Sequence, residues 1–116
     1  MADLRWVVDT APLVELKAGR ARVAVPTLCL FEVAQLEERG RISLGWPFEH
    51  WCDLVERAQG LVLQSLTRAC VAEARALSAL RHPFDRLIAG TAVALGVPLV
   101  TPDARIAQAG RVQIVW

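Results

Sequence analysis

The sequence predicts an α/β fold, in which a five-stranded parallel sheet carries helices on both faces. Short apolar runs alternate with longer segments of helical period, which is the order typical of βα units. The short runs are mostly uninterrupted by polar residues, as in strands that are covered on both sides. The chain has 116 residues, of which 54% are hydrophobic, so we expect one domain over residues 1–116 with a single core.

Five runs have the length and composition of strands: residues 5–8, 22–25, 61–66, 98–101 and 112–116. The helices between them are predicted from caps and glycines. Thr10 precedes a first helix that stops by Gly19, and Thr27 opens a second that runs toward Gly40. Further helices are expected over residues 48–58, 67–80, 84–95 and 104–109, and Gly96 closes the helix at 84–95. In the segment 48–58, apolar side chains recur at helical spacing on one face.

Composition excludes several classes of protein. Three cysteines at wide spacing, without a C-x-x-C pair, argue against a zinc site or a disulfide framework and favour buried small side chains. Neither a membrane span nor a basic leader followed by a long apolar stretch is visible, so we expect a cytoplasmic protein without membrane contact. Net charge is only +1, yet all basic residues except Lys17 are arginine. Arginine suits phosphate recognition, although a codon bias explains the same excess.

Four carboxylates follow or interrupt apolar runs, namely Asp9, Glu32, Asp85 and Asp103. Burying an unpaired carboxylate costs several kcal/mol or shifts its pKa, so a shared compensating charge is expected. Asp9 ends the first predicted strand and Asp103 follows the fourth, which places both at the carboxyl edge of a parallel sheet. Asp85 and Glu32 lie early in helices that border the same edge. If all four gather there, a divalent cation is the natural partner, as in enzymes that act on phosphate esters.

Each acid also has a purely structural interpretation, which spacing alone leaves open. Asp85 could interact with the dipole of its helix or pair with Arg81 or Arg86. Asp103 could serve as a turn or cap residue, and Asp9 as a helix cap. Glu32 is the hardest to explain in this way, because apolar residues surround it on its helix.

Five fragments in the same order resemble one known family. They are VVDT at 7–10, FEVA at 31–34, HPFDRLIAGTA at 82–92, LVTPDARI at 99–106 and VQIVW at 112–116. Together they resemble the PIN-domain proteins, specifically the VapC-type toxins of toxin–antitoxin pairs. The resemblance implies an endoribonuclease that depends on Mg²⁺ or Mn²⁺ and cleaves RNA phosphodiesters with a metal-activated water. Hard oxygen ligands select these ions.

The resemblance also implies roles for individual residues. Asp9, Glu32, Asp85 and Asp103 would be the catalytic acids that hold one or two ions, with Thr10 and Thr101 supporting them. The implied partners are an RNA substrate and a cognate antitoxin, and homodimerisation is expected by analogy. Five arginines flank the acids in sequence and are our candidates for RNA phosphate contact: Arg20, Arg22, Arg81, Arg86 and Arg105.

Two features depart from the family pattern. His82 stands where relatives often carry an acid, and the first crossover, residues 9–22, has room for one helix where two are common. The alternative is therefore a catalytically weak or inactive PIN-like module that acts through protein binding. A receiver-type phosphoacceptor is disfavoured because Lys17 is the only lysine, and a dehalogenase-like phosphatase because Ala11 replaces the required second acid.

Overall fold

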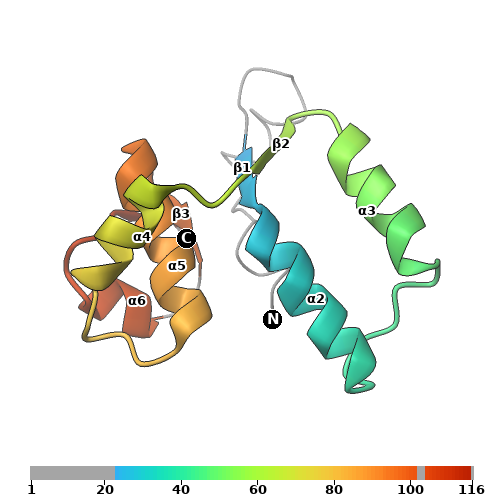
Figure 1. Cartoon of the computed structure of the whole chain (residues 1–116), viewed down its shortest axis with the longest axis horizontal. Helices are drawn as coiled ribbons and strands as arrows, with labels where there is room; N and C mark the ends of the chain where they lie inside the picture. The colour runs from blue at the N-terminus through green and yellow to red at the C-terminus, as the bar shows by residue number, and fades with distance from the viewer. Residues whose placement is uncertain (1–22, 102–103, 116) are drawn as a thin grey trace.

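The computed structural model of the chain describes residues 23–101 and 104–115 (Figure 1). The predicted strand at 5–8 and the helix after Thr10 lie outside these residues. The described elements in chain order are β1 (Val23–Pro26), α2 (Thr27–Glu38), α3 (Phe48–Arg57), β2 (Leu61–Gln64), α4 (Arg68–Arg75), α5 (Pro83–Leu95), β3 (Leu99–Val100), α6 (Ala104–Gln108) and β4 (Ile114–Val115).

The strands form two parallel pairs, which confirms the α/β class. β1 pairs with β2, with Val23 opposite Leu61, and β3 pairs with β4, with Leu99 opposite Ile114. Within the described residues these are two separate two-stranded sheets, so the single five-stranded sheet is not seen there. The strands β2, β3 and β4 are also shorter than predicted.

Helices α2 and α5 end at the glycines that the sequence indicated. After α2, the Gly40 N–H donates to the Glu37 carbonyl (3.0 Å) and the Arg41 N–H to the Leu36 carbonyl (2.9 Å), which is the Schellman arrangement. Gly40 has φ of 68°, a value that suits glycine. Gly96 ends α5 with the same φ.

Helix α4 begins as predicted but ends early. The Thr67 hydroxyl accepts a hydrogen bond from the Cys70 N–H, which caps the first turn. The prediction that this helix runs to about residue 80 is wrong, because it stops at Arg75. Carbonyls at its end are satisfied by the guanidinium of Arg86, which donates to Ala74 and Arg75. The helix can therefore end without a glycine.

The core is centred on α5. Ile88, Ala89 and Ala92 from this helix are buried together with Val25 of β1, Leu77 after α4, and side chains of β3 and α6. Helices α4, α5 and α6 gather around β3 at one side, and α2 and α3 lie at the other, with β1 and β2 between them (Figure 1). This arrangement brings the first turn of α5 next to α6.

The three cysteines and helix α3 follow the predicted pattern only in part. Cys29 and Cys70 are buried as expected, whereas Cys52 on α3 is half-buried. Phe48, Trp51 and Val55 of α3 are half-buried on the predicted face, and α3 packs against β2. Among the residues that the structure describes, none of the helices has the length and apolar composition needed to cross a bilayer.

Candidate active site

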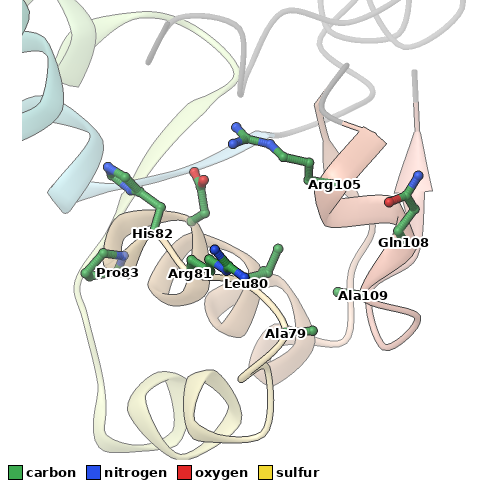
Figure 2. A pocket seen from close by; sticks show the side chains of 9 residues that line it. Ala79, Leu80, Arg81, His82, Pro83, Arg105, Gln108 and Ala109 are labelled. Carbon is green, nitrogen blue, oxygen red and sulfur yellow. The ribbon is translucent and has the colours of Figure 1, made fainter.

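A cavity of about 670 Å³ opens beside the first turn of α5 and faces α6. Figure 2 shows its wall, with Arg81 and His82 at the entry to α5 and Arg105 and Gln108 on α6. The residues that line it are Ala79, Leu80, Arg81, His82, Pro83, Asp85, Arg105, Gln108 and Ala109. Polar groups thus converge from two elements that are separated by the strand β3 in sequence.

Asp85 is the buried acid of this cavity. Only 6% of its surface is exposed, although it lines the cavity wall. Pro83 occupies the first turn of α5, where its missing N–H costs no hydrogen bond. Asp85 follows in the same turn, where the positive end of the helix dipole favours a carboxylate. The sequence HPFDR therefore starts the helix and holds the acid at its N-terminal end.

Glu32 lies on α2, which contacts α5 through a pair of aromatic rings. The rings of Phe31 and Phe84 meet edge to face, with their centroids 6.0 Å apart. Glu32 follows Phe31 and Asp85 follows Phe84, and in each pair the acid is the more buried residue. The Oε1 atom of Glu32 is shielded from solvent. The ring contact therefore joins the two helices at the residues that precede both acids in sequence.

Two of the predicted phosphate contacts line the cavity. Arg81 and Arg105 are exposed side chains at its wall, and Figure 2 shows Arg105 extending from α6 across the opening. Gln108 was missed by the sequence analysis. It lies three residues after Arg105, hence on the same face of α6, and this spacing is the signal that could have found it.

Arg86 is placed differently from Arg81 and Arg105. Its Nη2 atom donates to the Ala74 carbonyl at 3.0 Å and to the Arg75 carbonyl at 3.2 Å, and its Nε atom donates to Ala74 at 3.2 Å. It lines a shallow groove between α4 and α5 rather than the Asp85 cavity. These hydrogen bonds give Arg86 a structural role at the C-terminal end of α4.

The remaining predicted residues are distributed as follows. Thr101 is buried directly after β3. Asp9, Thr10, Arg20, Arg22 and Asp103 lie outside the described residues. Within residues 23–101 and 104–115, no three His, Cys, Asp or Glu side chains gather closely enough to hold a metal ion. The described part of the chain thus supplies two of the four predicted carboxylates, Glu32 and Asp85, and both offer the hard oxygen donors that suit Mg²⁺ or Mn²⁺.

His82 departs from the family pattern at an exposed position. Its ring meets Phe84 edge to face, with the centroids 5.8 Å apart, and it lines the cavity. Phe84 therefore contacts both His82 and Phe31. The position of the expected acid is therefore occupied by His82, one of three aromatic side chains that contact each other in sequence from His82 through Phe84 to Phe31.

Comparison with known proteins identifies one informative relative. No protein-family model matches the chain. Over 86 residues, the chain is 38% identical to Ribonuclease VapC22 of Mycobacterium tuberculosis (strain ATCC 25618 / H37Rv). The match covers 72% of this chain and 65% of the relative, slightly less than two thirds of its length. The resemblance drawn from the five fragments is therefore confirmed, since the chain is similar in sequence to a VapC ribonuclease.

Proposed function

We propose that this protein is an endoribonuclease that depends on Mg²⁺ or Mn²⁺ and hydrolyses RNA phosphodiesters. The observation that carries the proposal is the buried carboxylate of Asp85 in a cavity whose wall also holds Arg81 and Arg105. An acid that must act on a phosphate needs positive charge beside it, because a carboxylate alone repels the substrate. The ribonuclease name of the relative supports the same chemistry.

The residues of the site have different proposed roles. Asp85 and Glu32 are the acids that would hold the cation, together with Asp9 and Asp103 from outside the described residues. A bound divalent cation supplies Lewis-acid polarisation of the phosphate and a more acidic water. Arg81 and Arg105 position the phosphate by bidentate hydrogen bonds. Thr101, buried at the end of β3, and Thr10 support the acids.

We further propose that the strands belong to one five-stranded parallel sheet, in which the predicted strand at 5–8 is the fifth strand. The support is that both observed pairs are parallel and that Val25 of β1 and Leu99 of β3 lie in the same core. The segment RWVV at 5–8 has the mostly apolar composition of a strand that is covered on both faces. Amide hydrogen exchange tests this placement, because a paired strand protects its amides as strongly as β1 does.

Replacement of Asp85 by Asn tests the catalytic proposal. The purified protein is mixed with total bacterial RNA and Mn²⁺, and new 5′ ends are mapped by sequencing. We expect cleavage that a chelator stops, and a loss of about a hundredfold or more in rate in the Asp85→Asn variant. Mn²⁺ should raise the melting temperature of the wild type and raise that of the variant less, since one ligand is lost.

Asp53→Asn provides the matched control. Asp53 is an exposed acid on α3, outside the cavity, so this variant should cleave RNA and respond to Mn²⁺ like the wild type. A wild type that neither cleaves RNA nor gains stability with Mn²⁺ would contradict the ribonuclease proposal and favour the alternative, an inactive module that acts through protein binding.

The cellular setting belongs to the same proposal. We place the protein in the cytoplasm as the toxin of a toxin–antitoxin pair, bound to a cognate antitoxin and able to form a homodimer. The support is the VapC name of its relative. Growth arrest on expression of the wild type, relieved by the Asp85→Asn replacement, is the expected result in cells.

A further inference from the structure

We propose that Phe31, Phe84 and His82 form a stacking platform for an unpaired nucleobase of the RNA, next to the bond that is cut. We call these three residues the aromatic row. The proposal rests on the proposed ribonuclease function and adds to it the kind of RNA that the site accepts. It is carried by the ring contacts, by the exposure of the outer rings and by the place of the row beside Asp85.

The aromatic row is built from two elements. Phe84 lies at its centre in the first turn of α5, with its centroid 5.8 Å from that of His82 and 6.0 Å from that of Phe31 on α2. Both contacts are edge to face, with interplanar angles of 72° and 73°. Such contacts hold aromatic rings in a defined orientation. The half-buried central ring therefore positions two outer rings.

Both outer rings of the aromatic row are exposed to solvent. Phe31 is 54% exposed, the largest value among the bulky hydrophobic residues that the structure describes, and His82 is also exposed. An exposed phenylalanine offers a hydrophobic surface that a partner can cover. An aromatic ring and an imidazole together suit a flat heteroaromatic base, because bases stack on Phe and His.

The position of the aromatic row selects RNA as the partner. His82 lines the same cavity as Asp85, Arg81 and Arg105, and Figure 2 shows the His82 ring on the side of the cavity opposite Arg105. A phosphate held by the arginines would leave its neighbouring base within reach of His82. Cationic groups on one side and ring surfaces on the other are the two parts of a site for single-stranded nucleic acid.

A double-stranded RNA would not satisfy this arrangement. Bases in a helix are stacked on one another, so a protein ring reaches a base only where the strand is unpaired or the base is turned out. The proposed site therefore takes loops, bulges and single strands. It also gives a role to His82, where relatives often carry an acid.

Binding of a 12-nucleotide oligoadenylate, followed by fluorescence anisotropy at low salt with a chelator present, tests the proposal without cleavage. Phe31→Leu keeps an apolar side chain but removes the ring, and we expect its Kd to rise about tenfold. His82→Ala should act in the same direction, and Phe31→Trp should preserve or tighten binding because it restores a ring. Wild-type protein should bind the same sequence in a duplex more weakly.

Trp46→Leu is the matched control. Trp46 is 52% exposed and lies beside a histidine, His50, at 6.2 Å, but neither residue lines the Asp85 cavity. This variant should bind oligoadenylate like the wild type. A second control is an oligomer in which abasic units replace the bases, because stacking predicts that the wild type and Phe31→Leu then bind equally.

Several results would overturn the proposal. They are absence of oligoadenylate binding by the wild type, an unchanged Kd in Phe31→Leu, an equal loss in Trp46→Leu, or an equal loss on the abasic oligomer. A Phe31→Leu variant that binds oligoadenylate normally but loses self-association or binding to a partner protein would assign the ring to a protein interface. None of these results depends on cleavage, so the binding assay tests the aromatic row independently of the ribonuclease proposal.

Discussion

Helices α4 and α5 pack with their backbones almost in contact, whereas α3 lies apart from them and buries no side chain completely (Figure 1). A Cβ atom built on Gly90 of α5 would lie 2.7 Å from the Cys70 carbonyl oxygen of α4. By contrast, Leu54 of α3 is 42% exposed and Trp46, just before α3, is 52% exposed.

The difference indicates where the protein needs rigidity. Asp85 lies at the start of α5, and its position depends on how firmly α5 is held against α4. Catalytic groups are best placed by elements whose own packing is fixed. No residue of α3 lines the Asp85 cavity, so the loose packing of α3 does not affect the geometry of the site. Stability and site geometry should therefore be sensitive to changes in the α4–α5 pair and tolerant of changes in α3.

The largest expected effect comes from Gly90→Ala. Alanine normally stabilises a helix relative to glycine by about 0.5–1 kcal/mol, but here the added methyl meets the Cys70 oxygen and the Ala74 nitrogen, at 2.7 and 2.8 Å. Overpacking against backbone atoms should cost about 2–3 kcal/mol. Urea denaturation of the wild type and the variant measures this loss in the free energy of unfolding.

Gly45→Ala is the comparison on the other side of the molecule. Gly45 precedes α3, and a Cβ there meets nothing within 4 Å, although its φ of 76° disfavours alanine. Only the backbone strain remains, about 1–2 kcal/mol. If Gly90→Ala is no more destabilising than Gly45→Ala, the close approach of α4 and α5 does not hold the fold.

How far the sequence predicts this fold depends on whether the signals are local. The ends of α2 and α5 were predicted at Gly40 and Gly96, because a left-handed residue after a helix is a local signal. The apolar face of α3 followed from helical period alone. The end of α4 at Arg75 was not predicted, since the hydrogen bond to the Arg75 carbonyl comes from Arg86, which is 11 residues further along. Only the tertiary packing reveals that contact.

The same distinction applies to the candidate site. Asp85 was selected from its local motif, and the structure places it in the wall of a cavity. The sequence did not show that Phe31 and Phe84 touch, because their contact joins α2 to α5 across more than 50 residues. Nor did it separate Arg86 from Arg81 and Arg105, since all three flank the acids in sequence. Which arginine lines the cavity depends on the direction of each side chain.

A smaller effect is expected from Arg86→Gln. The variant loses the hydrogen bonds to the Ala74 and Arg75 carbonyls, so the end of α4 loosens and the free energy of unfolding should fall by about 1–2 kcal/mol. Arg57→Gln is the control, because Arg57 is an exposed residue in the last turn of α3. It should change stability by less than about 0.5 kcal/mol. Equal losses in the two variants would remove the distinction between the helices.

Arg86→Gln also separates a fold role from an RNA role. If Arg86 serves only α4, its replacement should leave the salt dependence of oligoadenylate binding unchanged. Arg105→Gln should instead reduce the slope, since one phosphate contact is lost. If the salt dependence of binding falls in both variants, Arg86 also contacts RNA phosphate.

The smallest effect concerns the thiols of the two regions, whose pKa values shift in opposite directions. Burial, and then the nearby acids Glu49, Asp53 and Glu56, raise the pKa of Cys52 on α3. At Cys70 on α4, burial by itself raises the pKa, but hydrogen bonds with Thr67 and Thr91 and to its backbone N–H outweigh burial and lower it.

The two shifts predict opposite pH dependence. Folding disfavours the Cys52 thiolate, so that contribution to stability is complete below the unfolded pKa of 9.0 and is lost as pH rises through the folded value. Folding favours the Cys70 thiolate, so its contribution is present above pH 9.0 and is lost as pH falls through the folded value.

Urea denaturation at pH 7 and pH 10 tests both signs. Relative to the wild type, Cys52→Ser should gain stability between the two pH values, and Cys70→Ser should lose it. The sign of each change is the criterion, because Cys70 is buried and its replacement also costs stability at pH 7. Parallel curves for the two variants would show that the hydrogen bonds of Thr67 and Thr91 do not distinguish the environment of Cys70 from that of Cys52.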